Sequence, residues 1–148
     1  MNREEKIKLA IEKGITYDPI SGKVYGIKGN EIIRKIDGYI NISITHLGKD
    51  YKIKAHQFAF YFIHKKIVDC IDHINKVRDD NRITNLRSIT KQQNHFNTKS
   101  KGYSFNKKLS KYKAYITLDQ IQKHLGYFNT EEEARQAYLD AKKIYHVI

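Results

Sequence analysis

The sequence is poor in the features that mark several classes of protein. Its 148 residues include one cysteine, Cys70, which excludes a disulfide framework and a four-thiolate zinc site. The longest apolar stretch, residues 55–63, is interrupted by His56 and Gln57 and is far too short to span a bilayer. The first residues lack the apolar run of a secretory signal. We therefore expect a soluble cytoplasmic protein of one or two small domains, with no membrane partner.

Acidic residues are also scarce, and the resulting positive charge is concentrated. The chain has 28 lysines and arginines against 16 acidic residues, a formal net charge of +12. Residues 76–113 hold 11 of these cations against Asp79 and Asp80, so this basic segment carries +9. Four aromatic residues lie among its cations or directly after them: Tyr103, Phe105, Tyr112 and Tyr115. This pattern predicts a polyanionic partner whose phosphates are neutralised, and a solvated lysine-rich surface is the alternative.

Hydrophobic patterning predicts short helices and strands in the first part of the chain. Residues 38–45 alternate, with Ile40, Ile42 and Ile44 on one face, which is typical of a half-buried strand. Thr90 and Gln93 have the spacing of a capping box, which predicts the start of a helix. The expected elements are helices over 3–13 and 55–65, strands over 23–27, 38–45, 51–54, 67–73 and 86–89, and a helix that begins after Thr90.

A linker over 97–100 is expected to lead into a second unit. Strands are predicted over 101–105, 111–118 and 122–127. Thr130 and Glu133 have capping-box spacing, and the final helix is expected over 131–145. One face of this helix gathers Ala134, Ala137, Tyr138, Ala141 and Ile144. The pattern therefore predicts a three-stranded sheet packed on one helix.

The residues with the most chemical potential are Asp72, His73 and Asn94. Neighbours on a strand point to opposite faces, so Asp72 and His73 are expected to have different roles. A carboxylate and an amide oxygen form a hard-oxygen site that suits Mg²⁺ or Mn²⁺, which favours Asp72 and Asn94 as the metal ligands. His73 is then available to activate a water. Because Asp-His is a common dipeptide, a purely structural histidine is the alternative.

The longer pattern of Asp72-His73-Ile74-Asn75, residues 81–90 and Asn94 resembles the HNH endonucleases, above all their phage and intron-encoded homing branch. The resemblance extends upstream to residues 55–58 and to the turn at 17–19. It implies an α+β fold with a beta-beta-alpha-metal core, in a nuclease domain over 1–98 whose core spans about 55–98. The departures are Gln57 in place of the family's usual arginine and the lack of paired cysteines.

The resemblance also implies a role for each site residue. His73 matches the general base, and Asp72 and Asn94 match the ligands of one divalent ion, Mg²⁺ or Mn²⁺. Asn85 matches the loop residue that holds the strand of the base in place. The neighbouring His95 stays open as the helix ligand, because adjacent helical residues lie about 100° apart and both cannot face Asp72.

The reaction implied by this resemblance is hydrolysis of a phosphodiester in double-stranded DNA, leaving 5′-phosphate and 3′-hydroxyl ends. Arg87 is either a clamp on a phosphate or an ordinary surface cation. A phage-encoded enzyme would work in the cytoplasm of a bacterial host. The oligomeric state is open between a monomer and a homodimer.

The second unit resembles a different family. Residues 111–116, 125–134 and 137–141 are similar to the plant ethylene-response-factor (APETALA-type) DNA-binding domain, which implies such a domain over 101–148. Alternation on its central strand predicts a DNA-reading sheet face. The family usually presents arginines there, which this chain lacks. With Arg87, the expected DNA-binding residues are Lys101, Ser104, Asn106, Lys108, Lys111, Lys113, Tyr115, Thr117, Gln122 and His124.

Two other function classes compete with an endonuclease. A DNA-binding protein without cleavage, similar to a transcription factor, would need the second unit but not Asp72, His73 and Asn94. An RNA-binding or RNA-processing protein would use the aromatic residues to stack bases.

Overall fold

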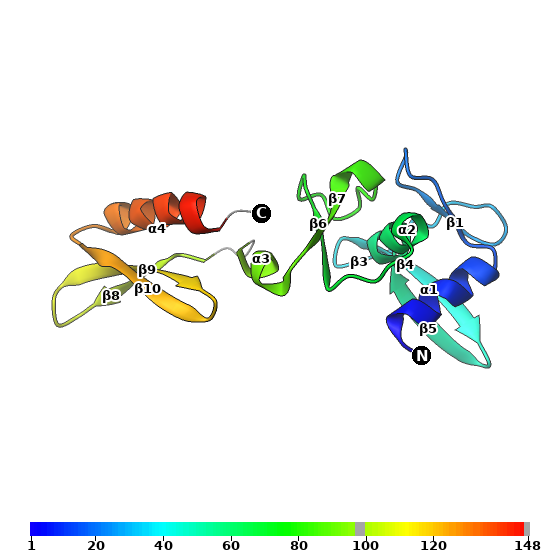
Figure 1. Cartoon of the computed structure of the whole chain (residues 1–148), viewed down its shortest axis with the longest axis horizontal. Coiled ribbons are helices and arrows are strands. Elements are labelled where there is room, and N and C mark those ends of the chain that lie inside the picture. Colours follow the sequence, from blue (N-terminus) through cyan, green and yellow to red (C-terminus); the bar gives the residue numbers. More distant parts are fainter. Residues whose placement is uncertain (97–99, 147–148) are drawn as a thin grey trace. The chain divides into compact units, whose positions relative to one another are not determined.

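The computed structural model describes residues 1–96 and 100–146 and divides the chain into two compact units, 1–89 and 90–148 (Figure 1). Both units mix helices with small antiparallel sheets, so the expected α+β class is confirmed. The linker expected over 97–100 lies, except for Ser100, outside the described residues. The division into domains 1–98 and 101–148 stays a prediction, and the compact units separate earlier, after Ile89.

The first unit contains three small sheets and two long helices. Its two-stranded sheet pairs β1 with β2, its three-stranded sheet has the order β3-β4-β5, and β6 pairs with β7. All of these strand pairs are antiparallel. The elements are α1 (Arg3–Glu12), β1 (Thr16–Tyr17), β2 (Val24–Tyr25), β3 (Lys35–Ile36), β4 (Tyr39–His46), β5 (Lys49–Lys54), α2 (Ala55–His64), β6 (Cys70–His73), the 3-10 turn η1 (Ile83–Asn85) and β7 (Leu86–Ile89).

The core of the first unit forms where α1 and α2 pack against the β4–β5 hairpin (Figure 1). Ile42 and Ile44 on β4 are buried as the alternating pattern predicts. They meet Ile7 of α1 and Phe58 of α2 in one cluster. Each fully buried side chain of this size contributes about 1.5–3 kcal/mol of hydrophobic stabilisation. Leu86 belongs to the same cluster, so β7 and its partner β6 are anchored on this core.

The second unit consists of α3 (Lys91–Phe96), β8 (Tyr103–Asn106), β9 (Lys111–Leu118), β10 (Ile121–Phe128) and α4 (Glu131–Tyr145). Its sheet has the antiparallel order β10-β9-β8, and α4 lies along one face of it (Figure 1). Ile116 and Tyr138 meet in its small core. Gly102, at φ 75°, lies so close to Tyr138 that an added Cβ would collide with the ring. The sequence correctly predicts a three-stranded sheet on one helix.

Three local predictions need correction. The strand expected from residue 67 begins at Cys70. Ile144 is 69% exposed, and Leu139 packs on the small core in its place. Glu133 accepts a hydrogen bond from the backbone of Asn129 instead of Thr130, so only half of the expected capping box forms. Among the described residues, the structure has no helix with the length and apolar character needed to cross a membrane.

Candidate functional site

The β6–β7 hairpin places Asp72 and His73 on opposite faces. Asp72 lies across from Arg87, whereas His73 lies across from Leu86, which belongs to the core. The placement of the two side chains on opposite faces follows from strand geometry, because neighbouring side chains of a strand alternate between its faces. The sequence correctly predicts that the two residues face different surroundings.

The Asp72 carboxylate is held by two cations. Lys76 donates to both of its oxygens, at 3.0 and 3.1 Å, and Arg87 donates to Oδ2 from Nε at 3.0 Å and from Nη2 at 2.7 Å. Burial alone would raise the pKa of Asp72, but the hydrogen bonds from Arg87 and Lys76 hold it below its usual range. The carboxylate is therefore ionised near neutral pH and is only 9% exposed.

His73 lies in a cluster of buried polar and aromatic side chains. Its Nε2 is 3.0 Å from Oδ1 of Asn81. The centroid of its ring is 5.2 Å from the ring centroid of His56 and 6.0 Å from that of Tyr39. Its exposed fraction is 6%. Burial lowers the pKa of His56 to about 3, and its electrostatic interactions with His73 and Lys54 act in the same direction, so His56 stays neutral. The expected general base is thus held firmly and has limited contact with solvent.

Asn85 ties the two ends of the loop between β6 and β7. Its Oδ1 accepts a hydrogen bond from the backbone N–H of Asn75 at 3.0 Å, and its backbone oxygen accepts one from the backbone N–H of Ile74 at 2.9 Å. Its Nδ2 donates to Oδ1 of Asn75 and to the backbone oxygen of Asp80. This side chain therefore closes the loop directly after His73.

Asn94 and the alternative ligand His95 lie on α3. The capping box that begins this helix forms as predicted, because Thr90 Oγ1 accepts a hydrogen bond from the backbone N–H of Gln93, and Oε1 of Gln93 accepts one from the backbone N–H of Thr90. Both Asn94 and His95 are exposed. Because α3 belongs to the second unit and Asp72 to the first, their shared metal stays a prediction.

The expected DNA-binding residues of the sheet share one face by register. Across the strands, Ser104 pairs with Lys113 and Asn106 with Lys111. On the other side of β9, Tyr115 pairs with His124 and Thr117 with Gln122. Ala114 and Ile116, which alternate with them, are buried. The opposite side of the sheet, away from α4, is therefore a polar and basic face, which we call the sheet face. Of the two remaining lysines, Lys108 lies in the β8–β9 turn and Lys101 precedes β8.

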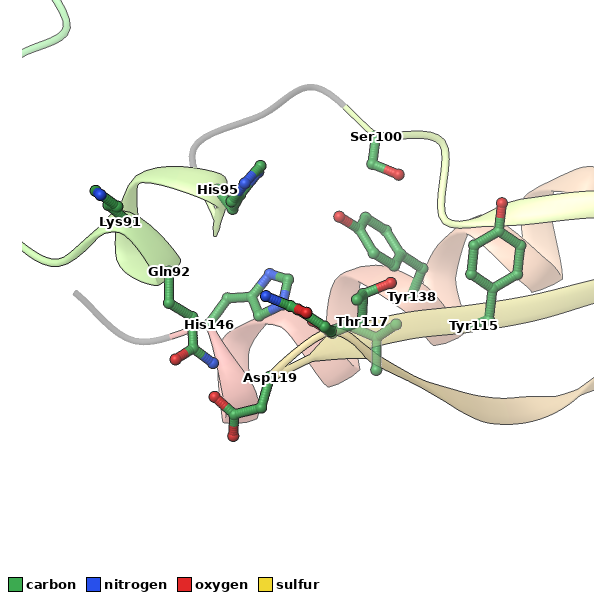
Figure 2. A pocket seen from close by; sticks show the side chains of 11 residues that line it. Lys91, Gln92, His95, Ser100, Tyr115, Thr117, Asp119, Tyr138 and His146 are labelled. Atoms are coloured by element: carbon green, nitrogen blue, oxygen red, sulfur yellow. The ribbon is translucent and has the colours of Figure 1, made fainter.

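A cavity of about 770 Å³ lies within the second unit. Figure 2 shows Tyr115 and Thr117 from β9 beside Tyr138 from α4. His95 also lines it. Three of the expected site residues therefore border this cavity.

The donor chemistry at Asp72 fits a divalent cation. Among residues 1–96 and 100–146, no three histidine, cysteine or acidic side chains gather as a metal cluster. A site with one carboxylate and one amide oxygen would not form such a cluster. The ionised carboxylate of Asp72 supplies the oxygen ligands that a hard cation binds. Both of its oxygens are paired with Lys76 and Arg87, so a metal ion there would compete with these two cations.

The comparison with protein families decides the class of this segment. Residues 69–96 match the family model of the HNH endonucleases. This segment is similar to the HNH endonuclease motif. The HNH motif spans β6, the loop closed by Asn85, β7 and α3, and it supports the predicted nuclease class. The match stops at residue 96, so the APETALA-type resemblance of residues 101–148 stays a prediction.

One solved structure is similar over most of the chain. It is described as "DNA binding and cleavage by the HNH homing endonuclease I-HmuI". The two chains are 26% identical, the similarity covers 74% of this chain and 70% of that one, and the TM-score is 0.47. No curated protein matches this chain.

The sequence does not reveal two side chains that contact the HNH residues. Lys76 binds Asp72 from four residues further along the loop, in a backbone conformation with φ 63° that returns its side chain to the strand. Asn81 contacts His73 from eight residues away. Spacing along the sequence does not show which loop side chains return to the strand; only the three-dimensional path of the loop does.

Proposed function

We propose that this chain is a metal-dependent DNA endonuclease of the HNH type that hydrolyses phosphodiester bonds. The observation that carries the proposal is the arrangement of Asp72 and His73. Within the segment that matches the HNH family, an ionised carboxylate and an imidazole occupy opposite faces of one strand. Binding alone needs neither group, whereas hydrolysis needs both a base and an anionic metal ligand.

His73 is the proposed general base. It takes a proton from a water that attacks phosphorus in line with the leaving 3′ oxygen, which yields 5′-phosphate and 3′-hydroxyl ends. The buried contacts with Asn81, His56 and Tyr39 restrict the imidazole to one orientation, and fixed orientation is a large part of catalytic efficiency. Asn85 is the proposed anchor of this strand, because its hydrogen bonds fix the backbone directly after His73.

Asp72 and Asn94 are the proposed ligands of one Mg²⁺ or Mn²⁺ ion, with His95 as the alternative to Asn94. When bound, a divalent ion supplies charge stabilisation for the phosphoryl group and the departing oxygen. The low pKa of Asp72 keeps the carboxylate ready to bind a cation. Arg87 and Lys76 pair with this carboxylate, and if a divalent ion were bound at Asp72, either cation could contact a DNA phosphate instead.

Double-stranded DNA is the proposed partner, and a phage or intron homing enzyme the proposed type. The net charge of +12 and the basic segment support a partner that carries phosphates. The sheet face adds a surface of the kind that enters a DNA groove. Its lysines favour phosphate contacts, and Tyr115, Thr117 and Gln122 offer the weaker base contacts.

A DNA-binding protein without cleavage is the second candidate. The observation that favours it is the two-cation clamp on Asp72, which could be a structural ion pair alone. Incubation of the pure protein with supercoiled plasmid separates the two. Relaxed or linear DNA that requires Mg²⁺ and disappears with a chelator supports the endonuclease, whereas a shifted but intact plasmid supports the second candidate.

Two histidine variants assign the chemistry to the site. His73→Ala is expected to abolish nicking while DNA binding persists. His46→Ala, a histidine at the end of β4 outside the cluster, is the matched control and is expected to cut like the wild type. Nicking by His73→Ala at the wild-type rate would show that His73 is not the base.

A further inference from the structure

Asn81 is the most deeply buried polar side chain in contact with the proposed base. It is 1% exposed, and its Oδ1 lies 3.0 Å from Nε2 of His73. An amide oxygen carries no hydrogen and can only accept, so Nε2 of His73 must donate in this contact. A neutral imidazole carries one ring proton. Its location on Nε2 leaves the lone pair on Nδ1.

The backbone of Asn81 is fixed by the hairpin near the start of the chain. Tyr17 Oη donates to the backbone oxygen of Asn81 at 2.7 Å, and the Ile83 amide donates to the backbone oxygen of Pro19 at 3.1 Å. Gly22, at φ 74°, packs directly on the peptide that joins Asn81 to Arg82, where an added Cβ would collide. The β1–β2 hairpin therefore determines where the Asn81 amide lies relative to His73.

This arrangement leaves one polar atom of the Asn81 side chain unsatisfied. Its Nδ2 is buried and has no hydrogen-bond partner in the described part of the chain. An unpaired buried donor lowers stability, and such groups call for an explanation beyond packing. A rotated amide would instead donate from Nδ2 to Nε2 and place the ring proton on Nδ1. The two orientations give opposite tautomers of His73, which an experiment can distinguish.

We infer that Asn81 is a positioning residue that orients the His73 ring and fixes its Nε2–H tautomer, so that Nδ1 is the nitrogen that accepts the proton of the attacking water. The inference rests on the proposed role of His73 as the base. It extends the site to the β1–β2 hairpin, which itself touches no reacting atom. Loss of an acceptor that fixes a catalytic tautomer lowers kcat by about 10- to 10⁴-fold in other enzymes.

The direct test is long-range ¹H–¹⁵N NMR of the full chain at a pH where His73 is neutral. His73→Gln assigns its signals among the seven histidines. The wild type should show an Nε2–H proton that is protected from exchange and an unprotonated Nδ1. Asn81→Asp keeps an acceptor and should retain this pattern, whereas Asn81→Leu should lose the protected proton. A wild-type spectrum with the proton on Nδ1 would overturn the inference.

Matched variants separate positioning from general loss of structure. Asn41→Leu removes another buried asparagine, one that bonds to the Tyr39 backbone, and should keep the protected proton. Should Asn81→Leu fail to fold, Tyr17→Phe removes only the hydroxyl that holds the Asn81 backbone and should speed exchange of the His73 proton. Tyr61→Phe, which removes a hydroxyl bonded to Glu4, is its control and should not. Equal exchange in both tyrosine variants would contradict the inference.

Cleavage kinetics distinguish this inference from the proposed function. Asn81→Leu is expected to lower kcat about 10- to 100-fold with KM unchanged, and Asn81→Asp to recover most of it. A wild type that shows the protected Nε2–H but never cuts DNA would overturn the endonuclease proposal alone. A wild type that cuts, together with an Asn81→Leu variant that cuts equally fast, would overturn the positioning role alone.

Discussion

Arg87 donates two hydrogen bonds to the same oxygen of Asp72, from Nε at 3.0 Å and from Nη2 at 2.7 Å. The two residues are cross-strand partners on β6 and β7, so the hairpin register itself builds this pair. Lys76 completes the clamp through both carboxylate oxygens. The proposed metal ligand is thus already neutralised by positive side chains, and a metal ion must compete with them.

This competition gives a prediction for Lys76→Met. With one of the two cations removed, Asp72 is expected to bind Mn²⁺ about two- to five-fold more tightly, as measured by titration calorimetry without DNA, because partly exposed ion pairs are worth up to about 1 kcal/mol. Lys23→Met removes a lysine from an ion pair with Glu31 in the same unit and is the control. Unchanged or weaker Mn²⁺ binding by Lys76→Met would refute competition at Asp72.

The buried His56 predicts a loss of stability in acid. Its pKa is lowered to about 3 in the folded chain, while an unfolded histidine titrates near 6.5. Below pH 6.5 the unfolded state therefore binds more protons, so the free energy of unfolding falls as the pH decreases toward 3. One group with this shift accounts for about 2–3 kcal/mol between pH 6.5 and pH 4.5.

Urea unfolding at these two pH values measures the effect. His56→Phe is expected to reduce the pH dependence by roughly that amount. His64→Phe, an exposed histidine at the end of the same helix, is expected to leave it unchanged. An identical pH dependence in His56→Phe and the wild type would show that His56 does not cause the acid sensitivity.

Asn85 predicts a local effect on the loop that follows His73. Asn85→Ala removes the acceptor of the Asn75 amide and the donor to Asp80, and these partly buried bonds are expected to contribute about 1–3 kcal/mol. Hydrogen exchange of the Asn75 backbone amide should be much faster in Asn85→Ala than in the wild type. Asn106→Ala, in the second unit, should leave that exchange rate unchanged. A protected Asn75 amide in Asn85→Ala would show that the loop is closed by other contacts.

The sequence predicts the elements well because their signals are local. Alternation of Ile40, Ile42 and Ile44 is enough to place β4, and Thr90 with Gln93 is enough to place the start of α3. The contacts within the site are not local in this sense. The approach of Asn81 to His73 depends on the path of a turn and on the docking of Tyr17, a residue 64 positions away from Asn81 along the chain.

The capping box of α4 shows the same limit on a smaller scale. The spacing of Thr130 and Glu133 correctly predicts the hydroxyl as the cap. It does not determine which backbone N–H donates to the Glu133 carboxylate. Asn129 N and Thr130 N are neighbours, and in the structure Asn129 N is the donor. The spacing of residues identifies the side chains that can cap a helix, and their rotamers determine which hydrogen bonds they form.

The sheet face predicts how DNA affinity depends on salt. The double variant Lys111→Gln and Lys113→Gln is expected to reduce the slope of log K against log salt by about 2, because each lost phosphate contact removes about 0.9. Lys142→Gln with Lys143→Gln, on α4 at the other side of the sheet, removes the same charge and should change the slope less. Fluorescence anisotropy at several salt concentrations measures both. Equal slopes in the two double variants would mean that overall charge, rather than the sheet face, attracts the DNA.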